Sequence, residues 1–315
     1  MTISDALIIG GGPAGLSVAT GLARQLHRAI VFDSGVYRNS LASHMHNVAS
    51  WDHKLPEEFR QAARDRILSR YETIQFENIE IKKVQRTSEG FNAVDSRDRV
   101  WTGKKLVFAN GVRDILPDIP GYGECWGLGI FHCLFCHGFE ERGCKSAGVL
   151  AIGDMANIMA AMHVARMARR FAMTVTIYTH GAQELTEALE KASHGTGIKV
   201  DSRVITRLVK GLGPSDVEVG LEDGTQIMEG FLVHKPKTEF NGPFAKQLGL
   251  QLTSDGDIKT SDPFYSTSVP GVFAAGDCAG PMKAVVMAMS SGTMVAGGLA
   301  GQLQAELYSG EQKQT

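Results

Sequence analysis

The chain has 315 residues, of which 43% are hydrophobic and 21% are charged, and its formal net charge is −2. A chain of this length can bury one large or two medium cores. The balanced charge argues against nucleic acid or an anionic membrane as the main partner, and no apolar run reaches the roughly 20 residues of a membrane span. The five cysteines are an odd number and, apart from one pair, are scattered, which favours a reducing, cytoplasmic compartment over a secreted disulfide framework.

The N-terminus carries a pattern typical of dinucleotide binding. An apolar strand is expected at residues 5–9, followed directly by Gly10-Gly11-Gly12-Pro13-Ala14-Gly15, a helix over 16–26 and a second strand at 29–32 that ends in Asp33. This order of strand, G-x-G-x-x-G turn, helix, strand and acid is the dinucleotide-binding fingerprint in its required context.

Each feature of that fingerprint has a physical role. Gly10 is expected to make the tight turn, Gly12 to let the backbone approach a pyrophosphate, and Gly15 to let the helix pack on the strand. The helix N-terminus offers amide groups and a positive dipole end to the phosphates. Asp33 can accept hydrogen bonds from the ribose hydroxyls.

The remaining elements alternate in type along the chain. In order, we expect a helix over 55–71, short strands within 73–101, a strand at 105–110, a linker at 117–123, a strand at 148–152, a helix over 156–172, strands at 175–178, 203–210, 217–221 and 226–228, a return linker at 235–243, a strand at 271–277 and a helix over 284–308. The strand and helix at 148–172 repeat the βαβ plan of the N-terminus and predict a second α/β unit.

A Cys-x-x-Cys pair, Cys133 and Cys136, is followed directly by His137. The pattern also occurs where c-type haem attaches, but that requires export, and residues 1–10 carry no signal-peptide pattern. A zinc site needs four ligands, and no second Cys pair or spaced His pair accompanies this one, so no metal is expected. Two buried structural cysteines are a further alternative. The neighbouring cofactor motif favours reversible thiol–disulfide chemistry.

Three pieces together resemble the low-molecular-weight thioredoxin reductases: the glycine-rich turn at 10–15, the Cys-x-x-Cys pair, and the late segment Val272-Phe273-Ala274-Ala275-Gly276-Asp277. The resemblance implies an α/β protein with two Rossmann-like dinucleotide-binding domains. One is a discontinuous FAD-binding domain, 1–116 with 241–315, and the other is an NADPH-type domain, 117–240, that carries the cysteines. It also implies a homodimer.

Two departures from those reductases are informative. Met155 replaces the glycine of the second dinucleotide motif, and residues 178–183 lack the paired arginines that hold an NADPH 2′-phosphate. His137 stands where the reductases carry an aspartic acid. A reductase needs an acid for a leaving thiolate, whereas an oxidase needs a base for an incoming thiol, and histidine suits the second role near neutral pH.

Both departures, together with the segments at 37–39, 43–46 and 131–133, are similar to the dithiol oxidases of gliotoxin and holomycin biosynthesis. That resemblance implies an FAD-dependent oxidase that closes a small-molecule dithiol to a disulfide and passes the electrons to O₂. It implies catalytic roles for Cys133, Cys136 and His137, with Cys133 attacked by substrate and Cys136 on the flavin side. Leu134 and Phe135 are expected to face an apolar substrate. The implied cofactor contacts are Gly10, Gly11, Gly12, Pro13, Ala14, Gly15, Asp33, Ser34, Arg38, Asn39, His46, Gly111, Asp277, Ala284 and Val285.

Three other functions stay open on the sequence. The chain could be an NADPH-dependent reductase of thioredoxin or a small disulfide, a flavoprotein for another oxidation or cyclisation, or a flavin-binding interaction module. Reduction of the flavin by NADPH separates the first from the oxidase.

Overall fold

The computed structural model describes residues 3–311. It divides into two compact units, the first made of Met1–Ser40, Lys54–Arg113 and Thr238–Thr315 and the second of Leu41–His53 and Asp114–Lys237. The predicted domain limits, 1–116 with 241–315 and 117–240, stay a prediction. The loop Leu41–His53 groups with the second unit, although no feature of the sequence signalled this.

The first unit is built on a mixed sheet with strand order β17-β18-β19-β6-β1-β2-β3, to which the hairpin β4–β5 is added through β6. Its strands are β1 (Ser4–Ile9), β2 (Ala29–Phe32), β3 (Ile74–Glu77), β4 (Ile81–Thr87), β5 (Gly90–Asp95), β6 (Val100–Phe108), β17 (Thr260–Ser261), β18 (Ser266–Thr267) and β19 (Val272–Ala274). Its helices are α1 (Pro13–Arg24), α2 (Pro56–Arg70), α7 (Phe244–Leu248), the 3₁₀ turn η2 (Gly276–Ala279) and α8 (Val285–Glu311).

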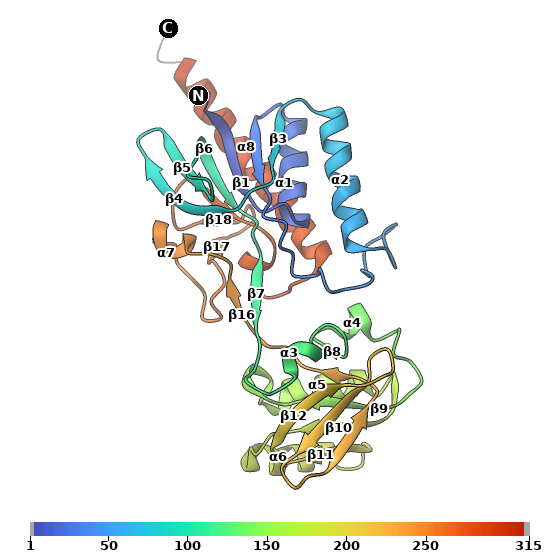
Figure 1. The fold of residues 1–315 in the computed structure, drawn as a ribbon. Coiled ribbons are helices and arrows are strands. Elements are labelled where there is room, and N and C mark those ends of the chain that lie inside the picture. Colours follow the sequence, from blue (N-terminus) through green and yellow to red (C-terminus); the bar gives the residue numbers. More distant parts are fainter. Residues whose placement is uncertain (1–2, 312–315) are drawn as a thin grey trace. The chain divides into compact units, whose positions relative to one another are not determined.

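Helices α1, α2 and α8 pack on one face of this sheet (Figure 1). Val18 of α1 and Val295 and Leu299 of α8 are fully buried in the cluster that also holds Ile8 and Val31 of the sheet. The long C-terminal helix packs closely on α1 because Gly292 has no side chain to collide with the carbonyl of Ala14. The expected N-terminal strand–turn–helix–strand unit is therefore confirmed.

The second unit contains a parallel sheet of order β11-β10-β9-β15-β8 and an antiparallel sheet of order β12-β13-β14. The strands are β8 (Ile130–Phe131), β9 (Cys144–Leu150), β10 (Ala172–Tyr178), β11 (Ile198–Asp201), β12 (Ile205–Lys210), β13 (Val217–Leu221), β14 (Gln226–Glu229) and β15 (Leu232–Val233). The helices are α3 (Tyr122–Cys125), α4 (Leu134–His137), the 3₁₀ turn η1 (Gly153–Met155), α5 (Ile158–Ala168) and α6 (Gln183–Ser193). Strands β7 (Val112–Ile115) and β16 (Lys237–Phe240) pair where the chain passes between the units.

The predicted α/β class is confirmed, and the differences are shifted element ends and short elements that were not predicted. The helix expected from residue 156 begins at Ile158, because Asn157 adopts the N-cap position and its side chain accepts a hydrogen bond from the Ala160 amide. Helices α3, α4, α6 and α7 were not predicted. Within residues 3–311, no helix is long and apolar enough to cross a bilayer.

Candidate active site

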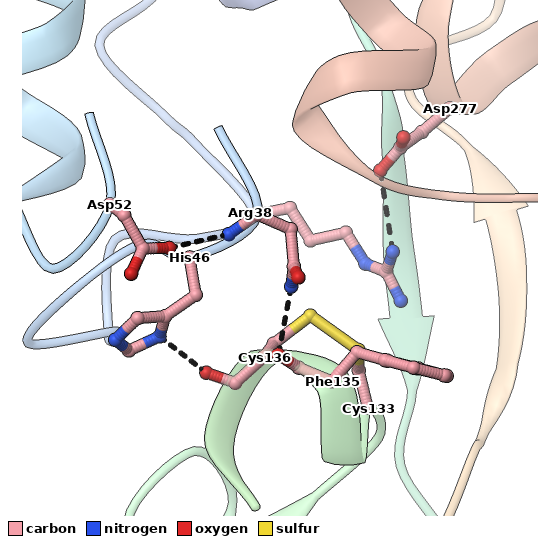
Figure 2. Close-up of a disulfide and its surroundings, with 8 residues drawn as sticks. Arg38, His46, Asp52, Cys133, Phe135, Cys136 and Asp277 are labelled. Carbon is pink, nitrogen blue, oxygen red and sulfur yellow. Dashed lines mark hydrogen bonds and ion pairs between the residues drawn. A yellow bond between two sulfur atoms is a disulfide. The ribbon is translucent and has the colours of Figure 1, made fainter. Parts of the chain in front are cut away.

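Cys133 and Cys136 form a disulfide on a single helical turn in the second unit (Figure 2). Their Cα atoms are 5.3 Å apart. The carbonyl of Cys133 accepts hydrogen bonds from the amides of Cys136 and His137, both at 3.2 Å. The backbone of α4 therefore holds the two sulfur atoms within bonding reach of one another, as reversible thiol–disulfide chemistry requires.

The two residues between the cysteines have different environments. Leu134 is buried in the core of the second unit, whereas the side chain of Phe135 is 75% exposed. The side chain of Leu134 anchors α4 to the core, so it does not face a substrate, contrary to the expectation. Phe135, and Phe139 one turn further at 63% exposure, remain available to an apolar molecule.

His137 ends α4 with its imidazole stacked on the ring of Phe131 at 4.6 Å. Burial lowers the pKa of His137 below its ordinary value of 6.5, and the neighbouring His46 lowers the pKa further while Glu140 raises it. The lowered pKa keeps the imidazole neutral at pH 7, which is the form that can accept a proton.

The loop Leu41–His53 contacts the redox turn through two side chains. Nδ1 of His46 lies 2.7 Å from the carbonyl oxygen of Cys136, and Nδ2 of Asn47 donates to the carbonyl of Phe135 at 2.8 Å. The contact of His46 appears in Figure 2 as a dashed line. His46 is the predicted cofactor contact that the structure places with the second unit, so its role toward a flavin stays a prediction.

The other predicted cofactor contacts lie in the first unit, near the carboxyl ends of parallel strands. Strands β2, β1, β6 and β19 are neighbours and run parallel. Asp33 follows β2, the glycine-rich turn follows β1, Gly111 follows β6, and Asp277 follows β19. Ligands of doubly wound sheets bind outside this edge, so residues far apart in sequence are brought to one place.

The glycines of the first turn behave as the fingerprint requires. Gly10 has φ of +118°, and a side chain there would collide with the backbone of Ala109. A side chain on Gly15 would collide with the carbonyl of Gly10, so this glycine lets α1 start tightly against β1. At Gly12 a Cβ would meet nothing within 4 Å. Gly12 therefore leaves bare backbone facing open space at the N-terminus of α1.

Two acidic residues at this edge, Asp33 and Asp277, interact with side chains of the 37–39 segment. The Tyr37 hydroxyl donates to Asp33 at 2.5 Å, and burial, with the adjacent Asp33 carboxylate, raises the pKa of Tyr37. Arg38 pairs with Asp277 at 3.3 Å across 239 residues of sequence (Figure 2). Asn39 accepts a hydrogen bond from Arg60 at 3.1 Å.

These residues fit FAD. The open space over Gly12, next to the α1 amides, suits a pyrophosphate. Each carboxylate oxygen of Asp33 keeps a further lone pair for a ribose hydroxyl. Ala284 accepts the first hydrogen bond of α8 from Ala288, so Ala284 and Val285 form that helix N-terminus, as predicted.

Replacing Gly12 by leucine is expected to strip the flavin, because the side chain would fill the space above the α1 amides. The ratio of flavin to protein absorbance measures the loss. Gly301→Leu is the matched control, since Gly301 lies in α8 with nothing within 4 Å of its Cβ position. Full flavin content in Gly12→Leu would contradict the assignment of the pyrophosphate site.

The second dinucleotide motif, at residues 153–158, differs from the one at residues 10–15 in structure as well as in sequence. Met155 is buried, and its sulfur accepts a hydrogen bond from the Lys235 amide at 3.0 Å. Asn157 caps the following helix with its own side chain. After β10, Nδ1 of His180 accepts from the Ile205 amide at 2.9 Å. In the second unit, Met155 therefore packs into the core and polar side chains bond to the backbone next to the motif.

Several contributors to the site had no signal in the sequence. His53 and Glu140 lie beside His46, and the stacking of His137 on Phe131 depends on the fold of α4. The pairing of Arg38 with Asp277 could be found only from the sheet order, which brings β19 beside β6.

The fold and the redox turn define an oxidoreductase. Residues 4–292 match the pyridine nucleotide-disulphide oxidoreductase family, and the chain belongs to this family. Thioredoxin reductase aclD of Aspergillus oryzae is 47% identical, with 95% of this chain and 96% of that protein covered. Thioredoxin reductase sirT of Leptosphaeria maculans is 43% identical, covering 95% and 94%.

Among solved structures, the crystal structure of HlmI matches with a TM-score of 0.88 and 29% identity over 99% of this chain and 96% of that chain. The predicted resemblance to thioredoxin-reductase-like proteins is therefore confirmed.

Proposed function

We propose that the protein is an FAD-dependent oxidase that closes the two thiols of a small molecule to an intramolecular disulfide, with O₂ as electron acceptor. The observation that carries this proposal is the Cys133–Cys136 disulfide with the buried His137 directly after it, in a unit whose second dinucleotide motif has the buried Met155 in place of a glycine. Burial lowers the pKa of His137, which favours its neutral form. A small-molecule dithiol and O₂ as partners, and a homodimeric assembly, belong to the same proposal.

The cysteines carry the chemistry in two exchange steps. A substrate thiolate attacks Sγ of Cys133, the Cys133–Cys136 bond breaks, and Cys136 leaves as a thiolate. The second substrate thiolate then attacks the mixed disulfide at the substrate sulfur and displaces Cys133. The substrate has lost two electrons and two protons, and the protein holds a reduced cysteine pair.

His137 supports the first step as a base. Thiols of small molecules have pKa values near 8.5, so only a few per cent are ionised at pH 7. An imidazole that is neutral at this pH can accept the thiol proton. Exposed Phe135 and Phe139 favour an apolar substrate, because an apolar molecule that covers them removes both rings from water.

Bound FAD would supply the two-electron acceptor for the reduced pair and return those electrons to O₂. The chain's contribution is to hold it: Gly12 and the α1 amides at the pyrophosphate, Asp33 at a ribose, and Asp277 with the start of α8 at the other end.

The alternative is an NADPH-dependent disulfide reductase. It is favoured by the names of the two relatives, both called thioredoxin reductases. Against it stand the buried Met155 and the capped start of α5.

Anaerobic mixing separates the two functions. An apolar 1,3- or 1,4-dithiol is expected to bleach the oxidised flavin spectrum, and NADPH to leave it unchanged. In air, one O₂ should be consumed and one H₂O₂ formed for each disulfide, since the dithiol gives up two electrons. Fast bleaching by NADPH with no bleaching by dithiols would establish the reductase instead.

A further inference from the structure

Three potential metal ligands converge beside the redox turn, from segments far apart in sequence. His46 and His53 belong to the loop Leu41–His53, and Glu140 follows α4. Nε2 of His46 lies 3.1 Å from Nδ1 of His53 and 3.4 Å from Oε1 of Glu140. The three ligand atoms lie within 4.8 Å of one another, and all three residues belong to the second unit.

The backbone fixes which nitrogen of His46 faces this cluster. A carbonyl oxygen can only accept a hydrogen bond, so the contact with Cys136 at 2.7 Å requires the proton on Nδ1. In the neutral imidazole, Nε2 then carries a lone pair directed at His53 and Glu140. Metal-binding histidines are oriented in the same way, by a second ring nitrogen that donates to a carbonyl.

The resulting arrangement places Nε2 of His46 3.4 Å from Oε1 of Glu140 and 3.1 Å from Nδ1 of His53. A divalent cation bound between these atoms would contact all three. His53 is further oriented by His44, whose ring stacks on it at 4.1 Å with an interplanar angle of 2°. Contacts within the second unit thus orient the rings of both histidines.

Two of the three spacings between the ligand atoms are close to those around a tetrahedral zinc ion. Zinc binds nitrogen and oxygen at about 2.0–2.2 Å, which separates tetrahedral ligands by about 3.3–3.6 Å. The two distances from Nε2 of His46 are close to this separation. Two histidines and one glutamate are a ligand set that zinc accepts, with a fourth position open.

We propose that His46, His53 and Glu140 form a binding site for a divalent ion of the zinc class. The side chain of His46 is 13% exposed and that of Glu140 is 36% exposed, so an ion can enter from solvent. The ion links the loop Leu41–His53 to the segment that follows Cys136, and its fourth position accepts water or a thiolate. No local spacing signals this site, because the ligands are separated by up to 94 residues of sequence (140 minus 46). It also gives His46 a role other than cofactor contact.

Zinc chloride added to the oxidised, flavin-loaded protein tests the site, with bound metal measured by equilibrium dialysis. One zinc per chain is expected. His53→Asn and Glu140→Gln should each weaken binding by about 10-fold or more, because each removes a ligand. Asparagine is chosen because His53 has φ of +58°, a conformation that asparagine tolerates. His163→Asn, on the exposed side of α5, is the matched control and should bind as the parent does.

Zinc bound by cysteine must be separated from this site. A Cys133→Ser, Cys136→Ser double variant should keep its zinc, and X-ray absorption should show nitrogen and oxygen near 2.0 Å with no sulfur near 2.3 Å. Absence of stoichiometric zinc, undiminished binding in both ligand variants, or a sulfur shell would overturn the proposal. None of these results depends on oxidase activity, so the site and the proposed function fail separately.

Discussion

Replacing Cys136 by serine is expected to abolish turnover and to leave Cys133 as the residue that forms covalent adducts. Without the Cys136 thiol, the Cys133–Cys136 disulfide cannot form, and a mixed disulfide on Cys133 has no neighbouring protein thiol to resolve it. Treatment with the symmetrical disulfide of a small apolar monothiol should therefore leave one half of the reagent on Cys133. Intact-mass and peptide mass spectrometry measure the adduct and its position.

The remaining cysteines provide the control. Burial raises the pKa of Cys144 to about 11 and that of Cys278 to about 12, so both remain thiols and react slowly near neutral pH. Cys144→Ser should keep full turnover. If Cys133→Ser forms the adduct on Cys136 rapidly while Cys136→Ser stays unmodified, the order of the two cysteines is the reverse of the one proposed.

The parts of the fold that the sequence predicts are those with local causes. The turn at Gly10 needs a positive φ, Gly15 sits against a carbonyl, and Pro56 begins α2, so each leaves a signal within a few residues. Helix α4 has only four residues, too few for an apolar period, so no pattern in the sequence predicts that Leu134 points inward and Phe135 outward.

The candidate site depends more on tertiary structure. Cys133, Cys136 and His137 are adjacent in sequence, so the Cys-x-x-Cys pattern identifies them. His46 contacts the carbonyl of Cys136, which lies 90 residues away in sequence. Every residue has a backbone carbonyl, so the sequence does not identify this one as the partner of His46. Met155 marks a departure from the dinucleotide motif in the sequence, but only the structure shows that its side chain packs into the core and bonds with the Lys235 amide.

Replacing His137 by alanine is expected to slow substrate oxidation by about 10²–10⁴-fold near neutral pH, the usual worth of a general base. Because the pKa of His137 is lowered, the parent protein keeps the neutral base through the neutral range. The activity of the parent protein should therefore fall only in the acid range, where the pH drops below about 6.5 and passes through the lowered pKa of His137. In the variant this acid limb should be absent, and the rate should instead rise toward high pH as substrate thiols ionise unaided.

Stopped-flow reduction of the flavin by a dithiol, measured across pH, gives both profiles. His132→Ala is the matched control, because His132 directly precedes Cys133 as His137 follows Cys136, and its ring lies 5.9 Å from that of Trp126. It should change the rate less than 10-fold and keep the acid limb. A His137→Ala profile that overlays the parent at every pH would assign His137 to packing against Phe131 alone, since the lost base would then have no effect where thiols are protonated.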